Sequence, residues 1–284
     1  MARDNNVQSL DAVFFDEYTS PDAILKYTRA TAGHGISHLL DHDYKAVYLR
    51  AIECLSPEIR ERGIRVLEFG CGGGMNLIHL TSILAKSGVK VLQAVGTDFS
   101  PTLIEAARRE AAKYLGEEQR RKLEFHVAKN ETLIEDLASA TKTSPSRWAG
   151  SFDLIIGVNT LRYCFRGQRE MSCARDVMTL LPPGGVCVNI DMNARFPAFR
   201  SALKNKFRKV KEEECYIPTL AEYASPFEQT GFEILRKENF CWVPHSAGVL
   251  LCSTMRVMSP VLHAMAPDRA MRSLVVARKT MAQS

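Results

Sequence analysis

The sequence predicts an α/β fold with a mostly parallel, seven-stranded sheet, helices on both faces and an N-terminal helical cap. After residue 63, short runs rich in Val, Ile and Leu alternate with longer amphipathic stretches. Parallel neighbours need a crossover connection, and the intervening helices can supply it. The 46% hydrophobic content of the 284 residues is enough for a large buried core.

The first part of the chain favours helices. Residues 11–62 are interrupted at Ser20-Pro21 and again at Gly33 and Gly35, and they close in a polar stretch at 57–63. We therefore expect residues 1–63 to form a helical cap or lid and residues 64–284 to form the core domain.

Five strands are expected after the cap, followed by a closing pair. Their ranges are 65–69, 89–97, 123–128, 152–158, 186–191, 232–242 and 273–279. Helices are expected at 75–86, 101–115, 132–140 and 168–181, the last ended by Pro182-Pro183-Gly184-Gly185. Two insertions, 195–230 with a basic run and 244–266 with an apolar helix at 248–265, are expected to cover the tips of the strands.

Composition and charge exclude several classes of protein. A net charge of +5 falls well short of the concentrated positive field of a nucleic-acid-binding domain. The chain has no run of eighteen apolar residues and no basic-then-apolar N-terminus, so we expect a cytoplasmic protein without a membrane span or signal peptide. Eight scattered cysteines without a C-x-x-C pair argue against a zinc site.

A glycine-rich segment after the first strand is the most informative motif. It begins at Glu68, contains Gly70, Cys71, Gly72 and Gly74, and leads into a helix at Met75-Asn76. Glycines at such a junction allow a tight turn and a close approach to a ligand, and the helix N-terminus offers N–H groups to an anion. Met75 breaks the G-x-G-x-x-G dinucleotide fingerprint, and the phosphate-binding G-x-x-x-x-G-K-[ST] loop is absent. The segment therefore indicates a ligand loop of another kind.

The tip of the second strand carries an acid, in the sequence Asp98-Phe99-Ser100-Pro101. Ligands of open parallel sheets bind over the carboxyl ends of the strands. A carboxylate placed there can accept two hydrogen bonds from a ribose diol.

The E-x-G-x-G-x-G pattern from Glu68 to Gly74, followed by Asp98, resembles motif I and its partner acid in class I S-adenosylmethionine-dependent methyltransferases. The resemblance covers roughly residues 63–195 and implies a Rossmann-like fold. It also implies S-adenosyl-L-methionine as cofactor and S-adenosyl-L-homocysteine as product. Cofactor contacts are then expected from Glu68, Gly70, Cys71, Gly72, Gly74, Asn76, Asp98, Phe99, Asn130, Asn159 and Leu161.

Two segments depart from the family's patterns. Asn130 stands where relatives usually have a Gly-Asp pair, so it either contacts the adenine amino group or caps the following helix. The segment 159–162 lacks the Asn/Asp/Ser-Pro-Pro-aromatic motif of enzymes that methylate the amino groups of bases. This departure disfavours a nucleobase amine as acceptor.

Other residues are candidates for the acceptor side. Tyr27, Arg162 and Tyr163 are expected to bind the substrate, and His34, Tyr163 and His245 are the candidate catalytic residues. Tyr27 begins a segment whose aromatic, hydroxyl and glycine residues suit either a loop over a ligand or a surface turn. His34, His38 and His42 share a helix face, but the outer two are about 12 Å apart at 1.5 Å per residue, so no metal site is expected.

These features lead us to expect a methyltransferase that acts on an oxygen or nitrogen of a small biosynthetic or secondary-metabolite acceptor. C-methylation, a non-methylating reaction such as cyclisation, a non-catalytic partner subunit and an RNA-modifying enzyme stay open as alternatives. Met75 argues against a nicotinamide-dependent oxidoreductase, because it breaks the dinucleotide-binding fingerprint. We expect a small-molecule partner, no nucleic acid and no membrane, and a homodimer is left open.

Overall fold

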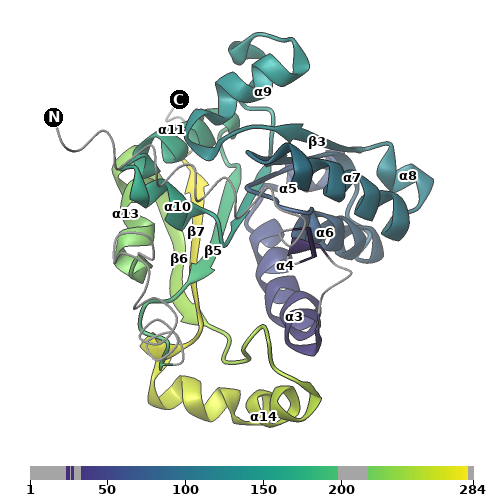
Figure 1. The fold of residues 1–284 in the computed structure, drawn as a ribbon. Helices are drawn as coiled ribbons and strands as arrows, with labels where there is room; N and C mark the ends of the chain where they lie inside the picture. The colour runs from purple at the N-terminus through teal and green to yellow at the C-terminus, as the bar shows by residue number, and fades with distance from the viewer. Residues whose placement is uncertain (1–23, 26, 29–32, 198–216, 281–284) are drawn as a thin grey trace, which may run out of the picture.

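A computed structural model of the chain describes residues 24, 25, 27, 28, 33–197 and 217–280, which form a sheet between two layers of helices (Figure 1). The seven strands follow the order β3-β2-β1-β4-β5-β7-β6. Strands β1 to β5 pair in parallel, whereas β7 runs antiparallel to both β5 and β6. The predicted mostly parallel, seven-stranded α/β fold is confirmed.

Each strand lies within two residues of its predicted bounds. The strands are β1 (Ile64–Phe69), β2 (Val91–Asp98), β3 (Leu123–Val127), β4 (Leu154–Val158), β5 (Val186–Met192), β6 (Phe232–Phe240) and β7 (Arg272–Lys279). Strand β4 is buried at every position, as expected for a parallel strand covered on both faces.

Helices cover both faces of the sheet. One face carries α3 (His34–His38), the π-helical η2 (Leu39–Tyr44), α4 (Lys45–Glu53), α5 (Pro57–Arg62), α6 (Met75–Lys86) and α7 (Pro101–Tyr114). The other carries α9 (Leu133–Thr141), α10 (Leu161–Arg166), α11 (Glu170–Leu180) and α13 (Leu220–Thr230). The remaining elements are α8 (Glu117–Arg120), α14 (Val249–Met265) and the short turns η3 (Asn130–Thr132), η4 (Pro145–Trp148) and η6 (Pro267–Arg269).

The described part of the N-terminal cap shares its core with the sheet. Leu40, Tyr44 and Tyr48 are buried in the same cluster as Ile64 of β1. His79 on α6 is itself buried, and its Nε2 lies 2.5 Å from the carbonyl oxygen of Leu40. Residues 33–62 therefore pack as part of the domain. The rest of the predicted cap falls largely outside the described residues.

Helix α13 was not among the predicted helices. It begins with a capping box in which Thr219 Oγ1 accepts from the Glu222 N–H at 3.3 Å and Glu222 Oε2 accepts from the Thr219 N–H at 2.7 Å. The basic run predicted within the first insertion lies at 198–216, outside the described residues.

A fully buried carboxylate, Asp153, ties α5 to the sheet. It accepts from Arg62 Nη2 at 2.7 Å and from the Arg65 N–H at 2.9 Å. We expect Asp153→Asn to lower the free energy of unfolding by about 2 kcal/mol, because the amide loses the charge and one acceptor oxygen. Urea unfolding measures this effect.

The matched control is Asp268→Asn, because the ion pair between Asp268 and Arg195 is about half exposed. It should cost less than about 0.5 kcal/mol. An equal loss in the two variants would contradict a special role for Asp153.

Candidate functional site

The loop after β1 depends on glycine. Gly70, Gly72 and Gly74 have φ values of 61°, 54° and 78°, in the left-handed region. A Cβ on Gly70 would lie 1.9 Å from Thr160 Oγ1, in the turn between β4 and α10. The loop backbone therefore lies directly against the next strand tip, and α6 starts immediately after it at Met75.

Asp98 joins this loop to the end of β2. Its side chain is almost fully buried, and its two oxygens accept from the Gly72 N–H and the Ser100 N–H, each at 2.9 Å. Burial raises the pKa of Asp98 to about 6, although these two hydrogen bonds act in the opposite direction. An ionised carboxylate offers about four acceptor positions, so roughly two remain for the hydroxyls of a ligand.

Glu68 lies beneath the loop, fully buried. Asn76 and the Leu77 N–H, in the first turn of α6, lie close enough to lower its pKa, but burial outweighs them and the pKa rises to about 8. Among the described residues, neither carboxylate oxygen completes a hydrogen bond. The structure thus places Glu68 under the start of α6.

Cys71 also points into the core. Its side chain is buried, and burial raises the pKa of its thiol well above the usual range. The backbone N–H of Cys71 donates to the Thr97 carbonyl at 2.7 Å, which fixes the loop to β2.

Asn130 and Asn159 follow β3 and β4 and turn in different directions. Asn130 Nδ2 donates to Thr160 Oγ1 at 2.7 Å, so its side-chain carbonyl points away from that hydroxyl. Asn159, in the left-handed region at φ 56°, accepts at Oδ1 from Arg272 Nη1 at 2.6 Å. Asn159 is thereby turned toward β7. Leu161 is fully buried in the core on the α10 side.

Arg162 and Tyr163 form a network with a buried acid. Arg162 Nη1 donates to Asp191 Oδ1 at 2.8 Å, and Arg162 Nη2 donates to Tyr163 Oη at 2.6 Å. The guanidinium also lies 4.4 Å from the centre of the Tyr163 ring. Asp191 at the end of β5 thus holds Arg162, and Arg162 in turn holds Tyr163.

Three aromatic residues predicted for different roles come together. Tyr27, Phe99 and Tyr163 all pack against Leu103 on α7. A Cβ on Gly73 would lie 2.4 Å from the Tyr27 carbonyl, so Tyr27 lies directly over the glycine loop. The structure therefore gathers residues from three distant segments at the strand tips.

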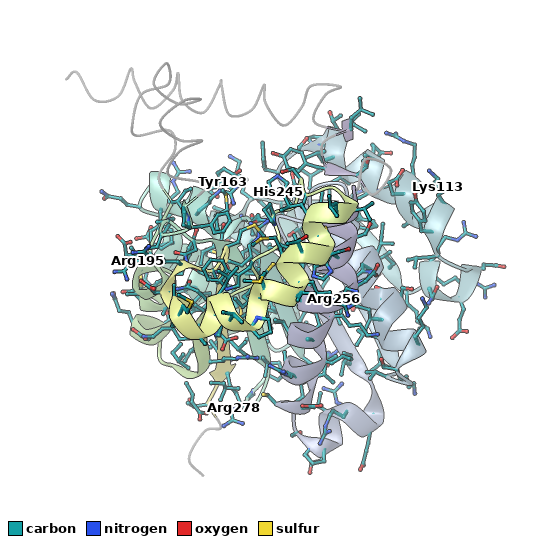
Figure 2. All side chains as sticks on the ribbon, turned by 90° about the horizontal axis from the view of Figure 1, so that it is seen from below. Lys113, Tyr163, Arg195, His245, Arg256 and Arg278 are labelled. Atoms are coloured by element: carbon teal, nitrogen blue, oxygen red, sulfur yellow. The ribbon has the colours of Figure 1, made fainter. Side chains whose placement is uncertain are left out.

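The candidate histidines come from two segments in contact. Helix α3 begins at His34, whose side chain is outside the described part of the chain. The neighbouring Gly35 N–H donates to the Ala247 carbonyl at 3.0 Å, in the turn that carries the exposed His245. Figure 2 shows Tyr163 and His245 toward the same edge of the molecule. In the described ranges, no three His, Cys, Asp or Glu side chains are grouped to hold a metal ion.

Comparison with known families gives this geometry a context. The profile of a methyltransferase domain family matches residues 40–237. The chain belongs to this methyltransferase domain family. Its fold is the Rossmann-like fold of class I S-adenosylmethionine-dependent methyltransferases, so the predicted family is confirmed.

Individual relatives of this methyltransferase-family chain are distant. A ubiquinone biosynthesis O-methyltransferase from Coxiella burnetii is 30% identical over 159 residues, which cover 56% of this chain and 55% of the relative. The chain thus spans about half the length of the curated relatives that it matches.

Solved structures show the same fold at low identity. The CurJ carbon methyltransferase is 16% identical, with a TM-score of 0.54 over 94% of this chain and 61% of its own. A chain from a Haloferax volcanii complex containing the Trm112 methyltransferase activator is 15% identical, with a TM-score of 0.53 over 92% and 99%.

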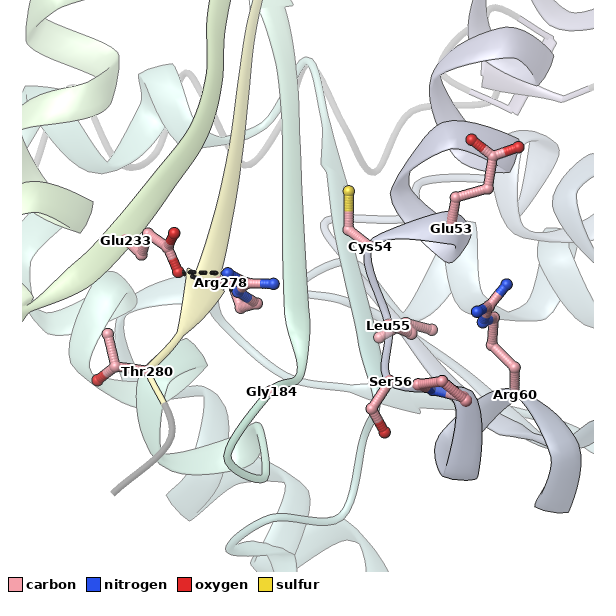
Figure 3. A pocket seen from close by; sticks show the side chains of 10 residues that line it. Glu53, Cys54, Leu55, Ser56, Arg60, Gly184, Glu233, Arg278 and Thr280 are labelled. Atoms are coloured by element: carbon pink, nitrogen blue, oxygen red, sulfur yellow. Dashed lines mark hydrogen bonds and ion pairs between the residues drawn. The ribbon is translucent and has the colours of Figure 1, made fainter. Parts of the chain in front are cut away.

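A groove of about 600 Å³ in this methyltransferase-family fold lies at the opposite end of the sheet (Figure 3). Its lining includes Ser56 before β1, Gly184 before β5 and Thr280 after the antiparallel β7, all at the amino ends of the parallel strands. The glycine loop and Asp98 are at the carboxyl ends. This groove is therefore separate from the candidate site.

Sequence reasoning missed four residues that contact the predicted site residues. They are Leu103, Thr160, Asp191 and Arg272. Asp191 carried a signal, since it is an acid at the predicted tip of the fifth strand. The contacts of Thr160 and Arg272 depend on pairing between distant segments, which no local pattern reveals.

Proposed function

We propose that the protein binds S-adenosyl-L-methionine over the carboxyl ends of β1 and β2 and transfers its methyl group to an oxygen or nitrogen of a small organic acceptor. The observation that carries this proposal is the buried Asp98 carboxylate, held by Gly72 of the loop and by Ser100. Membership of the methyltransferase family supports the reaction class. The relatives named O-methyltransferases support an oxygen nucleophile in a biosynthetic molecule.

The residues present fit this cofactor. Gly74 provides no side-chain cap to α6, so backbone N–H groups near the helix start are suited to a carboxylate. Asp98 would accept from the ribose hydroxyls, and the Asn130 carbonyl would accept from the adenine amino group. When bound, the cofactor supplies a methyl group already activated by its sulfonium sulfur.

The chain then has to align the acceptor, exclude water and remove a proton where the acceptor is a hydroxyl. We assign alignment and exclusion of water to Tyr27, Phe99 and Tyr163, with Tyr163 positioned by Arg162. His34, Tyr163 and His245 are our candidates for the group that takes the proton.

Titration calorimetry with S-adenosyl-L-homocysteine tests the cofactor assignment. We expect binding in roughly the micromolar range and about 30-fold weaker binding by Asp98→Asn, because the amide has one acceptor oxygen and no charge. Affinity should also fall as the pH falls below about 6, where the Asp98 carboxyl becomes protonated.

The matched control is Asp176→Asn. Asp176 also has a pKa raised to about 6 by burial, but it accepts from the Ile134 N–H on the opposite helical layer. The Asp176→Asn variant should bind S-adenosyl-L-homocysteine with the affinity of the wild type. The assignment would be overturned if the folded wild-type protein did not bind S-adenosyl-L-homocysteine, or if it bound NADH more tightly. Formation of S-adenosyl-L-homocysteine only when a small molecule with a hydroxyl or an amino group is added would identify the acceptor class.

A further inference from the structure

Arg272, the first residue of β7, carries a buried positive charge. Its side chain is only 5% exposed, and in the described part of the chain it has a single hydrogen bond, from Nη1 to Asn159 Oδ1. Its Nε is buried without an acceptor among the described residues. No Asp or Glu in those ranges forms an ion pair with Arg272, whereas Arg278 on the same strand pairs with Glu233 at 2.7 Å.

A buried guanidinium needs a negative partner. Arginine keeps its proton in proteins, so burial cannot neutralise it as it can a lysine or a histidine. An ion that is buried without a partner opposes folding, and a buried donor without an acceptor does so as well. Arg272 therefore indicates an anion-binding site.

The weak acids around Arg272 do not supply the negative charge. Burial raises the pKa of Tyr44 to about 12 and also raises the pKa of the Cys241 thiol, although the charge of Arg272 acts on both in the opposite direction. Both side chains are therefore neutral at neutral pH.

Two carboxyl groups lie in the same region, and each has another partner. The oxygens of Asp191 accept from Arg162, at 2.8 Å from Nη1 and at 3.2 Å from the backbone N–H. Asp43 Oδ2 lies 3.6 Å from His38 Nε2, and burial raises the pKa of the Asp43 carboxyl. The charge of Arg272 is therefore left over.

The backbone around Arg272 is unusual in three places. Asn159, which accepts from Arg272, has a φ of 56°, and Cys241 has a φ of 62°. They are two of the four non-glycine residues with positive φ in the described part of the chain. Tyr44 ends the π-helical η2. Because strained residues and π-helical turns are concentrated at functional sites, all three features favour a functional role for this region.

The guanidinium lies at the edge of the sheet that carries the candidate site. Arg272 pairs with Met192, the last residue of β5, and its side chain reaches Asn159, directly after β4. Strands β1 and β2, which lead to the glycine loop and to Asp98, lie on the other side of β4. Arg272 is thus at the strand tips, on the side away from the proposed cofactor position.

We propose that Arg272 binds a carboxylate of the methyl acceptor, so that the acceptor is an organic acid with a hydroxyl or an amino group to be methylated. The inference rests on the proposed function, since it names the acceptor class of that site. Nη1 donates to Asn159, which leaves the edge formed by Nε and Nη2 for the two oxygens of a carboxylate. A monoanion balances the one unpaired charge, whereas a dianion such as phosphate would also be repelled by Asp191.

Titration of the full chain with benzoate and with benzamide tests the proposal, because the two probes share a shape and differ in charge. We expect benzoate to bind at least about tenfold more tightly, since hydrogen bonds to a charged group are the stronger ones. Arg272→Gln should remove this preference, and Arg272→Lys, which keeps the charge, should retain part of it. NMR of the arginine Nε–H groups follows the same titration. The signal that is absent from Arg272→Lys should be the one that benzoate shifts.

The matched control is Arg278→Gln, which removes an arginine near the other end of β7, where Glu233 is its partner. This variant should keep the preference for benzoate, and thermal melting should show that every variant is folded. The proposal would be overturned if the wild type did not distinguish benzoate from benzamide, or if Arg272→Gln kept the preference.

Binding of S-adenosyl-L-homocysteine separates the acceptor from the cofactor as the source of the carboxylate. Arg272→Gln should bind this ligand within about twofold of the wild type, because the carboxylate of the cofactor is expected at the start of α6. A loss of affinity for S-adenosyl-L-homocysteine, but not for 5′-methylthioadenosine, which lacks the carboxylate, would assign Arg272 to the cofactor and contradict the proposal. A wild type that binds benzoate through Arg272 but no S-adenosyl-L-homocysteine would overturn the proposed function and leave the carboxylate site standing.

Discussion

Gly70→Ala is expected to lower the free energy of unfolding by about 3 kcal/mol and to remove binding of the proposed cofactor. The new Cβ would lie 1.9 Å from Thr160 Oγ1 and 2.6 Å from Thr160 Cβ, both far inside van der Waals contact. The positive φ of 61° adds a backbone cost for any residue with a Cβ. Thr160 is also held by Asn130 at 2.7 Å, so relieving the clash would break a second contact of the site.

Urea unfolding and calorimetry on the same preparation measure both effects. Gly88→Ala is the matched control, because Gly88 has φ 71° and nothing lies within 4 Å of its added Cβ. It isolates the backbone cost of about 1 kcal/mol and should leave ligand binding intact. If Gly70→Ala and Gly88→Ala lose equal stability, the contact with Thr160 is not the reason that position 70 requires glycine.

Glu68→Gln is expected to remove most of a decrease in stability of about 2 kcal/mol between pH 6 and pH 8. The pKa of Glu68 is about 8 in the folded chain and near 4.5 when unfolded, so the folded state holds its proton more tightly. Stability must therefore fall as the pH rises from about 4.5 to about 8, by roughly 1.4 kcal/mol for each pH unit. Glutamine stays neutral and avoids this loss.

Urea unfolding at pH 6, 7 and 8 gives the slope directly. Asp98 and Asp176 act with the same sign, but their pKa values of about 6 place their contribution mainly below this range. Glu124→Gln, which changes an exposed carboxylate on β3, should keep the wild-type slope. A Glu68→Gln variant with an unchanged slope would show that the buried carboxyl is not the source.

Local patterns were sufficient to predict most of the fold. Helix α6 has the predicted bounds because glycines stop the strand before it and its apolar residues recur at helical spacing. Helix α13 was missed although Thr219 and Glu222 form a recognisable capping box, since Pro226 interrupts the pattern. Which side of α14 is exposed could not be predicted, because a helix that is apolar on most sides does not show from its sequence which side is buried.

The position of a candidate site residue could be predicted where that residue directly follows a predicted strand. Asp98 and the glycine loop follow from their positions immediately after β2 and β1. The contacts of Asn159 with Arg272 and of Arg162 with Asp191 were missed, because their partners are 113 and 29 residues away in sequence. Only the order of strands in the sheet brings these side chains together.

The place of β7 also constrains how the chain folds during synthesis. β7 lies between β5 and β6, yet it is the last of the three to leave the ribosome. Strands cannot join the sheet in the order of their appearance, because β6 has no edge to pair with until residues 272–279 are available. Until then β5 keeps an unpaired hydrophobic edge, which is the kind of surface that chaperones cover and that neighbouring nascent chains can capture.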